Sequence, residues 1–160
     1  MQLVSLARIK RGGYIEAEAQ YVGQLAIPDM PPATRDRLAA LGEAATAAAR
    51  TRYEIQSAVR RRILDLAPAA RAKLNGKLED WHELDFSEFR AEIKRAFHVD
   101  MPVRERADWE AYLAENRAKV VALGSDIAAA EREIDAIVYG LFDLTPPEIA
   151  LLEASLEGQY

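Results

Sequence analysis

The chain has 160 residues with a net charge of −5, enough for one domain with a sizeable core. Half of the residues are hydrophobic, but alanine supplies much of that share and only 8% are aromatic, which favours long packed helices. The lack of cysteine excludes disulfides and thiolate metal sites. No apolar run approaches the roughly 20 residues of a membrane span, and no signal-peptide pattern opens the chain. We therefore expect a cytoplasmic protein.

The N-terminal region has a different character from the rest of the chain. Residues 2–9 have a β-like composition, Lys10 to Gly13 form a turn signal, and residues 14–18 could return as a second strand. This pattern predicts a short β-hairpin, either the remnant of a larger sheet or a hairpin that leans on helices. Prolines within residues 27–32 interrupt any regular element, so we place a domain boundary between residues 1–30 and 31–160.

Two long helices are predicted, over residues 35–66 with Thr34 as N-cap and over residues 103–141. In both, hydrophobic or small residues alternate at spacings of three and four, which is the seam of a coiled coil. The first seam consists of Leu38, Leu41, Ala45, Ala48, Arg52, Ile55, Val59, Arg62 and Leu66. The second consists of Trp109, Leu113, Asn116, Val120, Leu123, Ile127, Ala130, Ile134, Ile137 and Leu141. An antiparallel arrangement is the simpler of the two possible directions.

The segment between the long helices, residues 69–102, is the most aromatic part of the chain, with Trp81, Phe86, Phe89 and Phe97, and predicts a small helical subdomain at the hairpin tip. We expect a short helix over residues 69–74, a break at Asn75-Gly76, and a helix through Phe97 that Asp85 or Ser87 caps.

A final helix is predicted over residues 146–156. Asp143 can adopt the left-handed conformation that closes the preceding helix, and Thr145 with Glu148 forms a capping box. The expected fold is therefore mainly α: a long antiparallel helical hairpin with coiled-coil character, a helical subdomain at its tip, a C-terminal helix and a short N-terminal β-hairpin.

The sequence offers no catalytic constellation. Neither His82 nor His98 has a second histidine or carboxylate at metal-ligand spacing, and Gly12-Gly13 lacks the strand–loop–helix context of a phosphate-binding loop. Glu131, Glu133 and Asp135 are typical of a solvated helix face. We therefore expect no catalytic residue, no metal site and no cofactor in this chain.

Basic side chains concentrate in residues 50–77, where eight basic and two acidic residues give a local charge of +6. Arg60, Arg61 and Arg62 stand in the middle of this segment, and successive helical residues point about 100° apart, so at most two of them share a surface. They either provide solubility and ion pairs with the acidic second helix, or contact phosphates of a polyanion. The candidates for DNA-backbone contact are Lys10, Arg11, Arg60, Arg61, Arg71 and Lys73.

Several segments, in order, resemble one known family. Nine residues match a terminal pattern Ile-Asp-x-Leu-Val-Tyr-x-Leu-Tyr-x-Leu-Thr-x-x-Glu-Ile: Ile134, Asp135, Val138, Tyr139, Leu141, Leu144, Thr145, Glu148 and Ile149. Residues 81–89, Trp109-Glu110-x-Tyr112, Gly13-Tyr14 and residues 25–28 are similar to further segments of that family. The chain thus resembles the C-terminal, specificity-associated region of bacterial type II restriction–modification N6-adenine DNA methyltransferases, including those fused to an endonuclease.

The resemblance implies a non-catalytic helical domain that supports DNA target recognition and grips the DNA backbone. The family's cofactor-binding and catalytic motifs have no counterpart in this sequence, so S-adenosylmethionine and Mg²⁺ would belong to other domains. Expected partners are double-stranded DNA, bound weakly and without sequence preference, and methyltransferase or endonuclease domains. The alternative is a structural helical-hairpin module for protein–protein contact, through self-association as a homodimer or through docking to a catalytic subunit.

Overall fold

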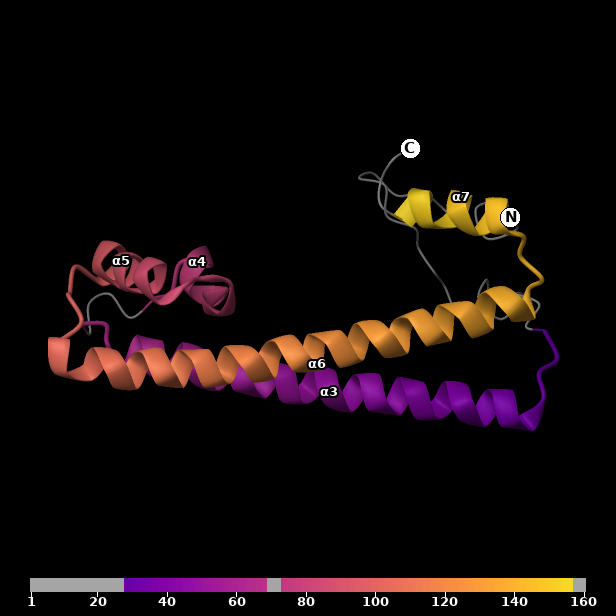
Figure 1. Ribbon diagram of the computed structural model, residues 1–160, viewed down its shortest axis with the longest axis horizontal. Helices are drawn as coiled ribbons and strands as arrows, with labels where there is room; N and C mark the ends of the chain where they lie inside the picture. The colour runs from indigo at the N-terminus through magenta and orange to yellow at the C-terminus, as the bar shows by residue number, and fades with distance from the viewer. Residues whose placement is uncertain (1–27, 69–72, 157–160) are drawn as a thin grey trace. The chain divides into compact units, whose positions relative to one another are not determined.

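The computed structural model describes residues 28–68 and 73–156 (Figure 1). The chain divides into two compact units, one of residues Arg35–Val138 and a second whose described residues are 28–34 and 139–156. Every regular element within the described ranges is a helix, which confirms the mainly α fold. The expected N-terminal β-hairpin, residues 2–18, lies outside the part of the chain that is described. No helix in the described part is both long and apolar enough to cross a membrane.

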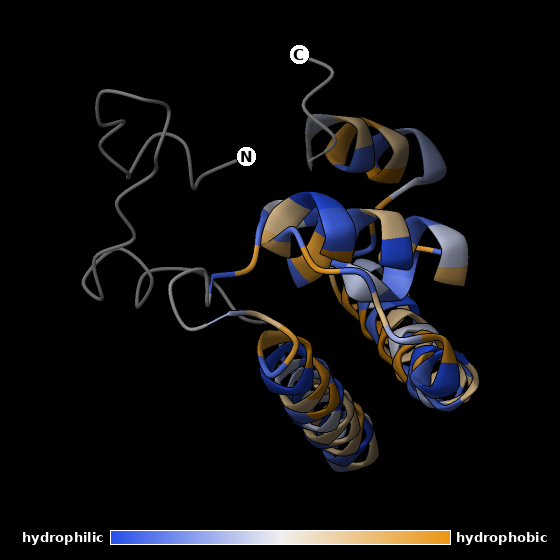
Figure 2. Cartoon of the chain, turned by 90° about the vertical axis from the view of Figure 1, so that its left-hand side faces the viewer, coloured by the Kyte–Doolittle hydropathy of each residue, from blue (hydrophilic) through white to orange (hydrophobic). Residues whose placement is uncertain are grey.

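Two long helices, α3 (Pro32–Leu64) and α6 (Arg106–Leu141), form the hairpin. Their antiparallel direction follows from contacts at both ends. Arg37, near the start of α3, binds Glu133 near the end of α6, with N–O distances of 2.7 Å. Arg62, near the end of α3, lies over the rings of Trp109 and Tyr112 near the start of α6. Figures 1 and 2 show the two helices side by side.

The helix ends differ from the predicted ones by a few residues. Helix α3 begins at Pro32, so Thr34 lies within the first turn and is not the N-cap. Proline suits this first position because its missing N–H would be unpaired there in any case. Helix α6 begins at Arg106, after the 3₁₀ helix η3 (Val103–Glu105), and ends at Leu141 as predicted.

The predicted seam is the buried side of the hairpin. All five buried residues of α6 are predicted seam positions, namely Trp109, Leu113, Val120, Ile127 and Ala130. On α3, Leu41 and Val59 are buried seam residues, but Ile63 is buried instead of its predicted neighbour Arg62. A step of four residues from Val59 to Ile63 keeps an apolar side chain inside, and Arg62 then lies at the edge of the seam.

The tip consists of α4 (Gly76–Glu79), the 3₁₀ helix η2 (Trp81–Glu83) and α5 (Phe86–Phe97). The predicted helix over 69–74 is wrong at residues 73 and 74, which are not helical, and residues 69–72 lie outside the described part. Asn75 does not simply break a helix: its side chain accepts a hydrogen bond from the Leu78 N–H and caps α4. The predicted cap of α5 is Asp85, which forms a capping box with Glu88.

The hydrophobic core lies where the tip meets the hairpin. Trp81, Phe89 and Leu78 are fully buried there, together with Val59 and Ile63 of α3. The same cluster includes Ile93, Phe97, Met101, Trp109, Leu113 and Val120. Residues 42–58 of α3 include no buried side chain. The tip is therefore a packed subdomain, whereas the stem of the hairpin is held by a narrow seam.

The turn after α6 follows the sequence prediction closely. Asp143 adopts a left-handed conformation with φ of 49°. The N–H of Leu144 donates to the carbonyl of Tyr139 at 3.1 Å and that of Asp143 to Gly140 at 3.3 Å, which is a Schellman motif. Helix α7 (Pro146–Leu156) then begins, and Glu148 Oε2 accepts hydrogen bonds from the Thr145 N–H and hydroxyl at 2.8 and 2.6 Å. Only this half of the predicted capping box is found, because the Glu148 N–H donates to the Thr145 carbonyl at 2.9 Å and not to its hydroxyl.

Candidate nucleic-acid interface

The three consecutive arginines of α3 have three different surroundings. Arg60 Nε donates a hydrogen bond to the carbonyl oxygen of Glu79 at 2.8 Å and so ties α3 to α4. The guanidinium of Arg62 lies 4.3 Å from the ring centroid of Tyr112 and 5.3 Å from that of Trp109. Arg61 is exposed and has no partner among the described residues. The roughly 100° step between helical neighbours produces this divergence.

The contact of Arg62 with α6 is a cation–π contact. Within the described residues, none of the three arginines forms an ion pair with a carboxylate of α6. The ion pairs that one of the two interpretations of the triplet predicted are therefore not found there. A guanidinium over two aromatic faces covers apolar surface at the seam edge while its donors remain near water. Arg62 therefore stabilises the junction of hairpin and tip, and Arg61 is the member of the triplet that is open to a ligand.

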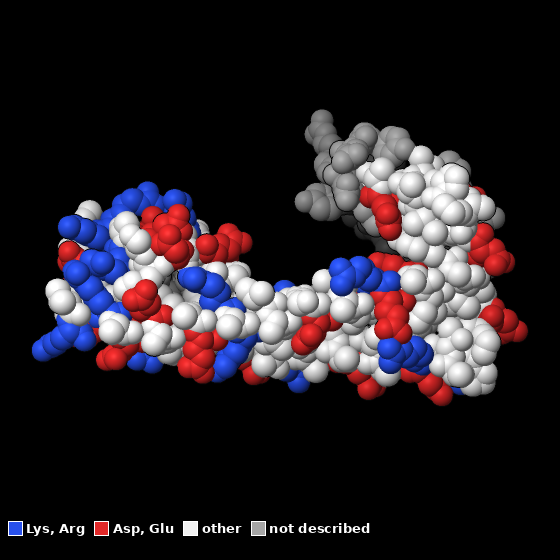
Figure 3. All heavy atoms as spheres, in the orientation of Figure 1, with Lys and Arg blue, Asp and Glu red and all other residues white. Residues whose placement is uncertain are grey.

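The other DNA-contact candidates are only partly described. Lys73 is exposed in the segment that enters α4, and Arg60 is half-buried. Lys10, Arg11 and Arg71 lie outside the described residues. The structure thus brings Arg60, Arg61 and Lys73 to the tip end of the hairpin, and their contact with DNA stays a prediction. Figure 3 shows lysine and arginine side chains gathered at its left-hand end, over α5 and the start of α6.

A buried carboxylate holds the tip helices together. Glu92 of α5 is only 7% exposed. Its Oε1 accepts hydrogen bonds from Asn75 Nδ2 at 2.6 Å and from Arg95 Nη2 at 2.5 Å. The hydrogen bonds from Arg95 lower the pKa of Glu92, burial opposes this, and the Asn75 hydrogen bond lowers the pKa further. Because Asn75 also caps α4, Glu92 fixes α4 against α5 and makes the tip a rigid platform for its surface cations.

The residues of the terminal sequence pattern have structural surroundings. Thr145 and Glu148 cap α7, and Asp135 is exposed on α6. The remaining six are half-buried: Ile134, Val138, Tyr139, Leu141, Leu144 and Ile149. Their spacing is explained by the end of one helix and the start of the next.

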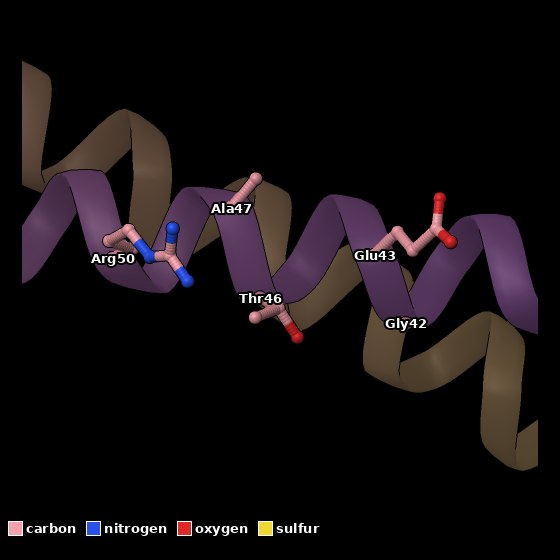
Figure 4. A pocket seen from close by; sticks show the side chains of 5 residues that line it. All are labelled: Gly42, Glu43, Thr46, Ala47 and Arg50. Atoms are coloured by element: carbon pink, nitrogen blue, oxygen red, sulfur yellow. The ribbon is translucent and has the colours of Figure 1, made fainter.

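The described residues contain no constellation suited to catalysis. A groove of about 360 Å³ lies along α3 and is lined by Gly42, Glu43, Thr46, Ala47 and Arg50 (Figure 4). A single helix supplies all of these residues, so no residue within the described ranges faces them across the groove to position a substrate. In the described ranges no three His, Asp or Glu side chains are placed to hold a metal ion.

No curated protein and no solved structure matches the chain. Residues 31–138, which are 108 of the 160, match the model of a family described as a domain of unknown function, DUF8810. The matched segment nearly coincides with the compact unit Arg35–Val138 and therefore covers the hairpin and its tip. That description names no activity, so the resemblance to methyltransferase C-terminal regions stays a prediction. By the extent of this match, the chain belongs to the DUF8810 family.

Proposed function

We propose that this chain is a non-catalytic helical domain that supports DNA target recognition by a restriction–modification methyltransferase or endonuclease and grips the DNA backbone. The observation that carries the proposal is the exposure of Arg61 and Lys73 at the packed tip of the hairpin. The ordered sequence resemblance supports the same function.

The mechanism is positioning. Contacts between basic side chains and phosphates fix the register and orientation of a protein on a duplex but carry no sequence information. Arg61 projects from the end of α3 between the fully buried Val59 and Ile63, and Lys73 lies two residues before Asn75, which binds Glu92. Base reading, methyl transfer and any use of S-adenosylmethionine or Mg²⁺ belong, in this proposal, to domains outside the chain.

The proposal is tested by fluorescence anisotropy with a generic 20-base-pair duplex at 50 and 200 mM salt. Arg61→Ala/Lys73→Ala removes two exposed tip cations and leaves the Arg60 hydrogen bond intact. The matched control is Arg35→Ala/Lys119→Ala, which removes the same two kinds of exposed side chain from the stem. We expect micromolar binding that weakens with salt, and a further loss of affinity in the tip variant only. Absence of binding at 50 mM salt refutes the proposal.

A second candidate function is protein–protein contact by the stem. Tyr53 of α3 is 65% exposed and Val121 of α6 is 61% exposed, and both are large apolar side chains on long helices. Such side chains suit a partner helix or a second copy of the chain. Sedimentation equilibrium of the wild type and of Val121→Lys tests this function. A dimer that is indifferent to DNA and that Val121→Lys dissociates supports it, and a monomer at 100 µM contradicts self-association.

A further inference from the structure

Three basic side chains surround a single carboxylate where α5 meets the start of α6. The guanidinium of Arg106 lies 3.4 Å from Asp100 Oδ1, that of Arg90 lies 3.9 Å from the same oxygen, and Lys94 Nζ lies 3.7 Å from Oδ2. Arg90 and Lys94 are one helical turn apart on α5, so they share a face. We call Arg90, Lys94, Asp100 and Arg106 the Asp100 cluster.

The Asp100 cluster carries an uncompensated charge of +2. Residues 90–106 contain five basic side chains and three acidic ones. Arg95 pairs with Glu92, and Arg104 pairs with Glu105 at 3.4 Å. The remaining cations are Arg90, Lys94 and Arg106, and Asp100 alone is left to neutralise them. The excess of this segment is thus concentrated on four neighbouring side chains.

Asp100 does not saturate the donors around it. Its distances of 3.4 to 3.9 Å are longer than the 2.7 Å of the Arg37–Glu133 pair in the stem. The side chain of Arg90 makes no hydrogen bond within the described residues, and its Nε is buried without a partner. Guanidinium groups present several donors in a planar fork that matches phosphate oxygens. An incoming anion would therefore meet the part of the Arg90 side chain that is exposed, together with the exposed ammonium of Lys94.

The cluster is also held in place before any ligand arrives. Arg106 Nε donates to the carbonyl of Met101 at 3.1 Å, and Met101 belongs to the buried core. His98, with φ of 57°, closes α5 in the left-handed conformation and directs the chain toward Asp100. The favourable interaction of basic residues with the C-terminal end of α5 accounts for Lys94 and Arg95. It does not account for Arg90, a full turn earlier, or for Arg106 on another helix.

We infer that the Asp100 cluster is a phosphate-binding site, which grips one phosphodiester of a DNA backbone. The DNA source of the phosphate rests on the proposed function, whereas the affinity of the cluster for phosphate does not. The three cations bind the phosphate oxygens, and Asp100 limits the affinity by competing for the same donors. Replacing Asp100 with a neutral residue must therefore strengthen binding.

Four single variants test the site by anisotropy with the same duplex. Lys94→Gln removes one exposed cation from the cluster, and Lys119→Gln makes the same change on the stem. Asp100→Asn removes the competing carboxylate, and Asp36→Asn makes the same change at the start of α3. Lys119 lies 13 residues along α6 from Arg106, which corresponds to about 20 Å. This distance exceeds the Debye length of about 10 Å at 0.1 M salt, so the charge of Lys119 is screened from the site.

We expect Lys94→Gln to weaken binding roughly tenfold at 50 mM salt and to lower the salt slope by about one, the value of one phosphate contact. Asp100→Asn changes affinity in the opposite direction, and the two stem controls stay within about twofold of the wild type, in line with the weak effect of distant surface charges. If the wild type binds the duplex but Lys94→Gln and Asp100→Asn behave like their controls, the inference is overturned while the proposed function stands.

Inorganic phosphate separates the two possible sources of the ligand. The probe is added to the full chain, and the Nε–Hε resonances of Arg90 and Arg106 are followed by NMR. One outcome is that phosphate shifts these resonances, that Lys94→Gln abolishes the shift, and that the protein does not bind the duplex. This outcome supports a site for free phosphate and refutes the proposed function. Duplex binding with the expected response of all four variants supports a backbone site. No response to either ligand refutes both.

Discussion

Glu92→Gln isolates the charge of the one buried carboxylate at the tip. The substitution keeps the shape of the side chain but replaces one acceptor oxygen with a donor. Because Asn75 Nδ2 and Arg95 both donate to Glu92, the new amide nitrogen must face one of them, donor against donor. Since Oε2 accepts only from Arg95 Nε, at 3.1 Å, the amide nitrogen is best placed there, and the variant loses that hydrogen bond within α5. The Asn75 hydrogen bond that links α4 to α5 remains but loses its charged acceptor.

The expected loss follows from the geometry. A hydrogen bond to a charged group contributes about 1.5–3 kcal/mol to stability. Arg95 is 67% exposed, so solvent screens its share and the lower end of this range applies. We expect the free energy of unfolding to fall by about 1.5 kcal/mol at pH 7. Glu115→Gln is the matched control, because Glu115 pairs with Lys119 at 2.7 Å but both side chains are exposed, and its effect should be small.

The same variant has a defined pH dependence. The folded-state pKa of Glu92 lies below the ordinary value of 4.5, mainly because Arg95 donates to the carboxylate. A carboxylate of lowered pKa contributes stability that is present above the unfolded pKa and is lost as the pH falls through the folded pKa. The difference between the wild type and Glu92→Gln should therefore be full at pH 7 and shrink below about pH 4.5.

Urea unfolding at pH 7 and pH 3 measures both effects. Both tryptophans of the chain, Trp81 and Trp109, lie in the tip core, so their fluorescence reports on the unfolding of this region. Circular dichroism follows the helices as a whole. A Glu92→Gln variant as stable as the wild type at pH 7, or a difference that widens at pH 3, would refute the structural role assigned to Glu92.

Substitutions at two further residues, Trp81 and Arg62, probe the junction between tip and hairpin. Trp81 is fully buried, and its indole N–H has no hydrogen-bond partner within the described residues. Trp81→Phe removes that donor at the cost of a small void, so it should change the free energy of unfolding by only about 1 kcal/mol. Trp81→Ala should cost about 3–5 kcal/mol in urea unfolding. Arg62→Met keeps the aliphatic stem but removes the cation over Tyr112 and should cost about 0.5–1 kcal/mol. A double-mutant cycle with Tyr112→Leu measures that contact, and a coupling energy of zero contradicts it.

The helices and their ends could be predicted from the sequence because their determinants are local. The 3-4 spacing identified every buried residue of α6, and the Asp143-to-Glu148 segment predicted both the end of α6 and the start of α7. Asn75 shows where local reasoning fails. The pair Asn75-Gly76 is a turn signal, and Asn75 also caps α4 by a local hydrogen bond, but only the arrival of Glu92 from α5 makes Asn75 a link between helices.

The candidate site was less predictable, because its parts meet only in three dimensions. The basic triplet Arg60 to Arg62 is conspicuous in the sequence, yet two of its members have partners within the fold. The Asp100 cluster is drawn from two helices and the turn between them, and its charges alternate with acidic residues in sequence. The four-residue spacing of Arg90 and Lys94 is its one local signal, and this spacing is common on helices.

A net charge of −5 does not argue against binding a polyanion. The second half of α6 has four acidic residues and one basic residue, whereas its first half has three of each, and Glu131 lies 25 residues beyond Arg106 in the same helix. At 1.5 Å per residue this separation is about 38 Å, nearly five Debye lengths at physiological salt. The charge of that half of α6 is therefore screened from the Asp100 cluster, in which Arg90, Lys94 and Arg106 outnumber Asp100. The length of α6 thus separates the acidic half of this helix from the cationic cluster at its other end.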